Sequence, residues 1–141
     1  MRLILDTNVV VAGLLWHGAP RRLIGLAIDD ESISLYSSPV LIGELANTLG
    51  YQRFVKRIAL FETSVAALVA QYEAMVTLVS PIHTPRVVTN DPDDDHVIAC
   101  AVAANAKSIV SGDKHLLTIT PYQNISILSP ANALGFIQAN K

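Results

Sequence analysis

The sequence predicts a single α/β domain, and three observations support this fold class. Short apolar runs of strand length recur along the chain, each followed by a longer segment with helical signals. Two of these runs lead into an aspartate, and ligands bind at the edge of an open α/β sheet where its strands end. The chain has 141 residues, of which 51% are hydrophobic, enough for one sizeable core and too few for two. We therefore expect residues 1–141 to form one domain.

Elements in the first half of the chain are indicated by apolar runs and by helix-start signals. A short run rich in β-branched residues favours a buried strand, and alternation of apolar and polar residues favours a half-buried one. Proline in the first helical turn after a hydroxyl cap predicts a helix start, as at Ser38-Pro39. We expect strands at 2–5 and 33–36, and helices at 9–16, from Ala19-Pro20 onward and at 39–49.

The second half is expected to begin with a long helix and to end with two further strands. Apolar residues spaced by three and four between 62 and 79 predict one scaffold helix that ends at Ser80-Pro81. Residues 82–88 are expected to be extended, because proline disfavours helix in the residue before it. We then expect a helix from 91, a strand at 107–111, an edge strand at 125–128 and a last helix opened by Pro130.

Residues 91–95 contain four carboxylates and lead directly into an apolar helix. Asp91 and Asp93 are explained by helix capping, because a helix N-terminus carries partial positive charge. Asp94 and Asp95 precede apolar residues one and two turns further on, so they lie at the margin of a buried helix and need a partner. A divalent cation is one such partner, since hard ions take oxygen ligands, and simple capping is the alternative.

Three further acids stand at positions typical of functional sites. Asp6 follows the first strand, and Asp113 follows the strand at 107–111 after a glycine that permits a tight turn. Glu44 has no Lys or Arg within helical reach, so no local ion pair explains it. Ordinary turn aspartates and an exposed helical glutamate are the alternatives.

Charge and composition exclude several classes of protein. Ten basic and twelve acidic side chains give a net charge of −2, which is not the footprint of general nucleic-acid binding. A local patch is still available at 51–57, with three cations and two aromatic rings, and its alternative is an amphipathic helix with a basic outer face. The single cysteine, Cys100, is expected to be a buried hydrophobe. No membrane span or secretory leader is visible, so we expect a soluble, cytoplasmic protein.

Four short motifs, taken in order, resemble the PIN domain, and in particular the ribonuclease toxins of VapC-like toxin–antitoxin pairs. They are the segments 3–8, 38–45, 95–99 and 110–113. Each motif is weak alone, whereas the ordered set at these separations is specific and spans nearly the whole chain. The resemblance implies a three-layer fold with a mainly parallel sheet of about four to five strands flanked by helices.

The same resemblance implies a site. It gives the catalytic acids as Asp6, Glu44, Asp95 and Asp113, with Asp6, Asp95 and Asp113 as ligands of Mg²⁺ or Mn²⁺. Asp95 is selected from its neighbours because it stands before x-x-Ile-Ala in the family pattern. Supporting positions around these acids are Thr7, Asn8, Ser111 and Asp94.

The implied activity is metal-dependent endonucleolytic cleavage of RNA by the toxin of a toxin–antitoxin pair. The candidate RNA-binding residues are Arg21, Arg22, Arg53, Lys56, Arg57 and Lys114. An antitoxin that contacts apolar residues such as Leu15 and Trp16, and a homodimer, are implied by the family alone. The alternative is a catalytically silent PIN-like module that binds RNA or protein. An aspartyl phosphatase is disfavoured because Asn8 occupies the place of its second aspartate.

Overall fold

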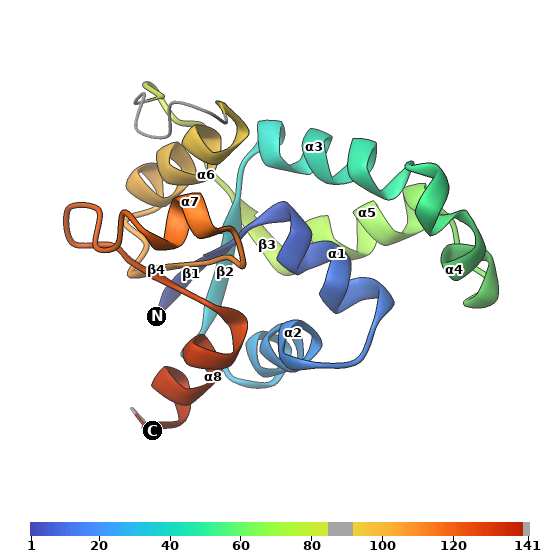
Figure 1. Ribbon diagram of the computed structural model, residues 1–141, viewed down its shortest axis with the longest axis horizontal. Coiled ribbons are helices and arrows are strands. Elements are labelled where there is room, and N and C mark those ends of the chain that lie inside the picture. Colours follow the sequence, from blue (N-terminus) through green and yellow to red (C-terminus); the bar gives the residue numbers. More distant parts are fainter. Residues whose placement is uncertain (85–91, 140–141) are drawn as a thin grey trace.

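A five-stranded parallel sheet forms the centre of the protein in a computed structural model that describes residues 1–84 and 92–139 (Figure 1). The strands are β1 Arg2–Leu5, β2 Ser34–Ser37, β3 Val76–Leu78, β4 Ser108–Val110 and β5 Ser126–Leu128. Their order in the sheet is β3-β2-β1-β4-β5, and every neighbouring pair is parallel. The central strand β1 places Ile4 between Tyr36 of β2 and Ile109 of β4.

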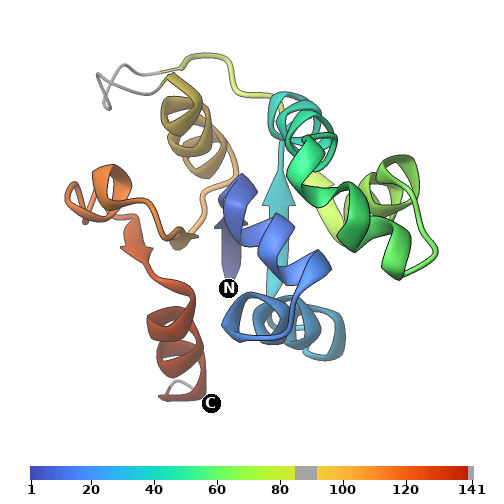
Figure 2. The ribbon, with the colours of Figure 1, turned by 45° about the vertical axis from the view of Figure 1, so that its right-hand side comes forward.

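Helices lie on both faces of the sheet, which gives the three-layer arrangement expected from the sequence (Figures 1 and 2). They are α1 Thr7–Leu15, α2 Ala19–Asp29, α3 Pro39–Leu49, α4 Val55–Leu60, α5 Val65–Met75, α6 Pro92–Ala103, α7 Lys114–Leu117 and α8 Pro130–Ala139. A short 3₁₀ helix, η1 Gln52–Phe54, precedes α4. None of the helices in the two described ranges is long and apolar enough to cross a bilayer.

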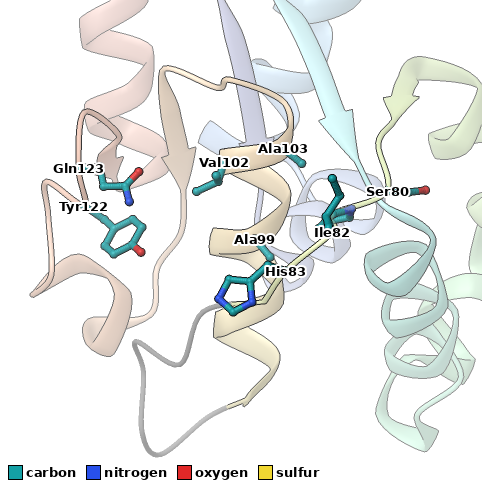
Figure 3. A pocket seen from close by; sticks show the side chains of 9 residues that line it. Ser80, Ile82, His83, Ala99, Val102, Ala103, Tyr122 and Gln123 are labelled. Atoms are coloured by element: carbon teal, nitrogen blue, oxygen red, sulfur yellow. The ribbon is translucent and has the colours of Figure 1, made fainter.

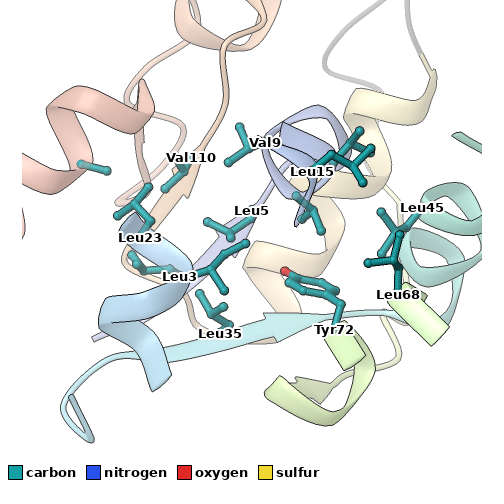
Figure 4. Packing of buried hydrophobic residues seen from close by; sticks show 14 of the residues in the cluster. Leu3, Leu5, Val9, Leu15, Leu23, Leu35, Leu45, Leu68, Tyr72 and Val110 are labelled. Atoms are coloured by element: carbon teal, nitrogen blue, oxygen red, sulfur yellow. The ribbon is translucent and has the colours of Figure 1, made fainter. Parts of the chain in front are cut away.

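Two hydrophobic cores form because side chains of a strand alternate between the faces of a sheet. Leu3 and Leu5 of β1 belong to the core that α1, α2, α5 and α8 cover (Figure 4). Ile4, between them, belongs to the second core, which includes Ile98 of α6 and Leu116 of α7. β1 is therefore buried on both faces, so the residue that follows it is held firmly at the sheet edge.

Serine side chains cap the first turns of α3 and α5 and fix where these helices begin. The Ser38 hydroxyl accepts a hydrogen bond from the Leu41 N–H at 3.3 Å, and Pro39 opens α3 as expected. The same device begins α5, where the Ser64 hydroxyl accepts from the Ala67 N–H at 3.1 Å. Because α3 begins at this cap, the position of Glu44 along the helix is set by local sequence.

The expected long helix at 62–79 is wrong at both ends. Glu62 has a positive φ of 54°, and α5 begins only after the cap at Ser64. At the other end the chain leaves the helix at Met75 and adds β3 to the free edge of β2. The cause is β-branched composition, since Val76 and Thr77 suit a half-exposed edge strand. Of the expected extended segment 82–88, residues 85–88 lie outside the described residues.

Cys100 provides a test of the packing of α6. The residue is fully buried, as expected, and burial raises the pKa of its thiol to about 12, against a lowering effect of a hydrogen bond with Ser38. Because the thiolate is the reactive form, we expect a thiol reagent at about pH 8 to label the native protein far more slowly than the urea-unfolded protein. Mass spectrometry measures the labelled fraction, and equal rates would contradict this packing.

Candidate active site

A pocket of about 230 Å³ contains carboxylates from four separate parts of the chain. The acids that line it are Asp6, Glu44, Asp94 and Asp113. Asp6 directly follows β1 and Asp113 shortly follows β4, its neighbour in the sheet, so both lie where parallel strands end. Glu44 comes from α3 and Asp94 from the first turn of α6. The rest of the lining is Thr7, Asn8, Thr48, Tyr51 and Arg53.

Asp6 is buried and its two carboxylate oxygens accept different hydrogen bonds. The Thr7 N–H donates to Oδ1 at 2.8 Å, and the Ser111 hydroxyl donates to Oδ2 at 2.7 Å. Ser111 Oγ also accepts from the Asp113 N–H at 3.0 Å, so this hydroxyl connects the loops after β1 and β4. The carboxylate of Asp6 is thereby held in one orientation.

The other three acids differ in how they are held. Asp113 is half-buried and caps α7, where its Oδ1 accepts a hydrogen bond from the His115 N–H at 2.8 Å. Glu44 Oε2 and Asp94 Oδ2 are both shielded from solvent. Glu44 and Asp94 thus both line the pocket with Asp6, and each keeps one carboxylate oxygen shielded from solvent.

The structure distinguishes the neighbouring acids of α6. Asp94 lines the pocket, whereas Asp95 is equally buried but is not among the lining residues. Successive residues of an α-helix point about 100° apart, so the two carboxylates leave α6 in different directions. Asp91 lies outside the described residues, as does the side chain of Asp93.

The donor chemistry of the pocket fits a hard divalent cation, because carboxylate oxygens are the ligands that Mg²⁺ and Mn²⁺ prefer. Among the residues that the structure describes, no three His, Cys, Asp or Glu side chains are grouped closely enough to hold an ion directly between them. Mg²⁺ keeps several of its waters and takes one or two carboxylates. The four acids therefore fit an ion held partly through water.

A larger pocket, of about 570 Å³, lies on another side of α6 (Figure 3). Its floor is formed by Ala99 and Val102 of α6, with His83 on one side and Tyr122 on the other. No carboxylate is among its described lining residues, so it lacks the acids of the candidate active site.

Arg53 is the cation at the acid pocket. Its guanidinium lies 5.2 Å from the centre of the Tyr51 ring and 4.8 Å from that of Phe54. The other candidate RNA-binding residues do not line this pocket. Arg57 is half-buried, and the exposed ones are Arg21, Arg22, Lys56 and Lys114.

Arg57 has structural contacts instead. Its Nε donates to the Leu15 carbonyl at 2.8 Å, and its guanidinium lies over the rings of Trp16 and Phe61. Trp16 is 40% exposed, as an interaction residue should be. Leu15 is fully buried, so the expectation that it contacts a partner is wrong; it faces the core because its position on α1 continues the buried side of Val11.

The two arginines should respond differently to substitution. We expect Arg57→Gln to lower the free energy of unfolding by about 1 kcal/mol, because it loses a hydrogen bond and two ring contacts. Arg53→Gln also loses two ring contacts but no hydrogen bond to Leu15, so it is expected to cost less stability than Arg57→Gln, and it removes a cation from the pocket and should weaken RNA binding. Urea unfolding and fluorescence anisotropy measure the two effects, and the reverse pattern would contradict the assignment.

Two further residues line the pocket although the sequence does not predict them as site residues. Tyr51 belongs to the basic patch at 51–57, and Thr48 stands one turn after Glu44 on α3. The helical spacing of Glu44 and Thr48 is the signal that could have identified the second of these.

Comparison with known proteins places this arrangement in a family. Residues 2–115 match the family model described as PIN domain. The uncharacterized protein MJ1680 of Methanocaldococcus jannaschii is 25% identical over 123 residues, which cover 84% of this chain and 75% of that protein. The fold is similar to that in the crystal structure of VapBC2 from Rickettsia felis bound to a DNA fragment from their promoter, with a TM-score of 0.61, 13% identity, and coverage of 90% of this chain and 97% of that one. Since the family model spans most of the sequence and the fold agrees, the chain belongs to the PIN domain family.

Proposed function

We propose that the protein is a metal-dependent endoribonuclease that hydrolyses RNA phosphodiester bonds and acts as the toxin of a toxin–antitoxin pair. The observation that carries this proposal is the convergence of Asp6, Glu44, Asp94 and Asp113 on one small pocket of a PIN domain. The likeness of the fold to VapBC2 supports the toxin assignment.

The four carboxylates of the pocket need a bound cation to offset their mutual repulsion. Carboxylates gathered in a cleft repel one another strongly at low local dielectric. Asp6, Glu44, Asp94 and Asp113 would hold Mg²⁺ or Mn²⁺, which would activate water for attack and stabilise the charge that develops on the phosphate. Asp94 takes the place in this set that the family pattern gives to Asp95, because it is Asp94 that lines the pocket.

The remaining residues position the reactants. Ser111 orients the Asp6 carboxylate through its 2.7 Å hydrogen bond. Arg53, at the same pocket, attracts a backbone phosphate of the RNA. Glu44, which lines the same pocket, would orient the attacking water. No covalent nucleophile is needed.

The experiment that tests the activity is cleavage of a structured RNA pool by the purified protein in EDTA, Mg²⁺ or Mn²⁺. We expect cutting with either ion and none in EDTA, with products resolved on a denaturing gel. Cutting that persists in EDTA would contradict metal dependence. No cutting with any metal would contradict the enzyme assignment.

A catalytically silent module is the second candidate, and one observation favours it. In the part of the chain that is described, no three potential metal ligands stand within reach of one ion. Such a module would bind RNA equally well with and without metal and would not cut it. Filter binding on the same RNA pool separates this outcome from a nuclease.

We further propose that an antitoxin covers the exposed face of Trp16 and that the toxin forms a homodimer. Trp16 packs edge-on against Phe54 with 5.9 Å between ring centres and lies beneath the Arg57 guanidinium, and 40% of its surface is still exposed. It is the single tryptophan of the chain, so its emission should shift to shorter wavelength when a partner buries it. Light scattering measures the mass of the assembly.

A further inference from the structure

A second pocket, of about 410 Å³, adjoins the acid pocket. The two share Glu44, Thr48 and Tyr51, so they are continuous along α3, and His96 of α6 also lines the second one. The second pocket is completed by Pro39, Val40, Gly43, Asn47 and His96. A strand whose phosphate lies at the acids can therefore continue into this pocket without leaving the surface.

The floor of the second pocket is one stripe of α3. Val40, Gly43 and Asn47 recur at spacings of three and four and so lie on the same side of the helix. Val40 is 51% exposed although it is apolar. A Cβ added at Gly43 would meet nothing within 4 Å, so the missing side chain leaves the floor open.

The lining suits a flat, uncharged group with hydrogen-bonding edges. Tyr51 offers a ring that is 49% exposed, against which a planar group can stack. The Asn47 amide and the His96 imidazole offer donors and acceptors. No Lys or Arg is among the described lining residues, and Glu44 repels anions, so this pocket does not favour a phosphate.

We infer that this second pocket is a nucleobase subsite, which takes one unpaired base of the RNA next to the phosphate that is cut. The inference rests on the proposed nuclease function for the identity of the phosphate beside the base, whereas the contacts to the base itself need no metal. The base stacks on Tyr51, and Asn47 and His96 contact its edge. A base that is paired in a duplex has its edge occupied, so the subsite selects single-stranded RNA.

The test is a substitution at Gly43 that places a side chain inside the second pocket. Gly43→Leu places a side chain where nothing stands within 4 Å, and it replaces a glycine inside a helix, so the fold should be retained. Gly135→Leu is the matched control, because Gly135 is also exposed, helical and free of neighbours within 4 Å, but lies on α8. Circular dichroism checks the fold of both variants.

The probes are a short unpaired oligoribonucleotide and an abasic ribose-phosphate strand of the same length, with binding measured by anisotropy in EDTA. We expect Gly43→Leu to weaken binding of the base-bearing strand about 10-fold, the size of one lost base–aromatic stack, and to leave the abasic strand unchanged. Gly135→Leu should change neither. Tyr51→Leu should likewise weaken binding of the base-bearing strand, and Tyr51→Phe, which keeps the ring, should restore it.

Equal affinity of the wild type and Gly43→Leu for the base-bearing strand would overturn the inference. So would a wild type that does not distinguish the two strands, or that binds neither. Because binding is measured without metal, a protein that binds bases here but cuts no RNA would refute the proposed nuclease and keep the base site. If the wild type cuts, a pattern of cut sites identical in Gly43→Leu would again refute the subsite.

Discussion

Asp6→Asn and Asp94→Asn are each expected to lower kcat/KM for metal-dependent RNA cleavage by at least about 100-fold, because loss of a supporting group alone typically costs 10- to 100-fold. Each substitution keeps the shape of the side chain and removes one negative charge from the pocket. Asp95→Asn is expected to retain much more activity, since Asp95 does not line the pocket. Initial rates on one RNA in Mg²⁺ measure the three effects.

The control for charge alone is Asp29→Asn, an exposed aspartate at the end of α2, which should cut at the wild-type rate. The position of Asp94 in the pocket would be refuted by the opposite ranking, with Asp95→Asn inactive and Asp94→Asn active. That outcome would mean that the family pattern, rather than the observed lining, identifies the catalytic acid of α6.

Ser111→Ala is expected to lower kcat/KM by about 10- to 100-fold and the free energy of unfolding by about 1–3 kcal/mol. The substitution removes the hydroxyl that donates to Asp6 Oδ2 and accepts from the Asp113 N–H. Both partners are then left to reorient inside a buried site. Steady-state cleavage and urea unfolding measure the two losses.

Ser108→Ala, in the strand β4 that Ser111 directly follows, is the matched control. Ser108 is also buried, but its hydroxyl has no hydrogen-bond partner among the described residues. Its removal relieves an unsatisfied polar group, so stability should be unchanged or slightly raised and activity unchanged. If Ser111→Ala and Ser108→Ala show the same kcat/KM and the same free energy of unfolding, the connection between Asp6 and Asp113 does not contribute to activity or stability.

Local signals predicted the elements best. The Ser38-Pro39 cap predicted α3 at its observed bounds, because capping is decided within one turn. The helix expected at 62–79 failed at Val76, because the β-branched residues Val76 and Thr77 suit an edge strand as well as the end of a helix when a neighbouring strand is available for pairing. Only the free edge of β2 decides this, and that edge is a tertiary feature.

The site was predicted in outline, with one ambiguity that sequence alone leaves open. Asp6 and Asp113 could be placed because each follows a buried strand. Asp94 and Asp95 could not be ranked by physical argument, since both precede apolar residues one and two turns later. Their difference is the rotation of α6 about its axis, which is set by the packing of Ile98 against the sheet.

The pairing of β1 with β4 also determines when the contacts of the acid pocket can form during folding. Ser111 reaches Asp6 across 105 positions of sequence, and β4 must align alongside β1 before that contact exists. Such distant parallel pairing is slow compared with the closing of local helices. An unfinished chain on the ribosome carries Asp6, Glu44 and Asp94 but neither Ser111 nor Asp113 until late in synthesis. A chain interrupted before Ser111 therefore contains three of the four acids of the pocket but lacks the hydroxyl that holds the Asp6 carboxylate in place.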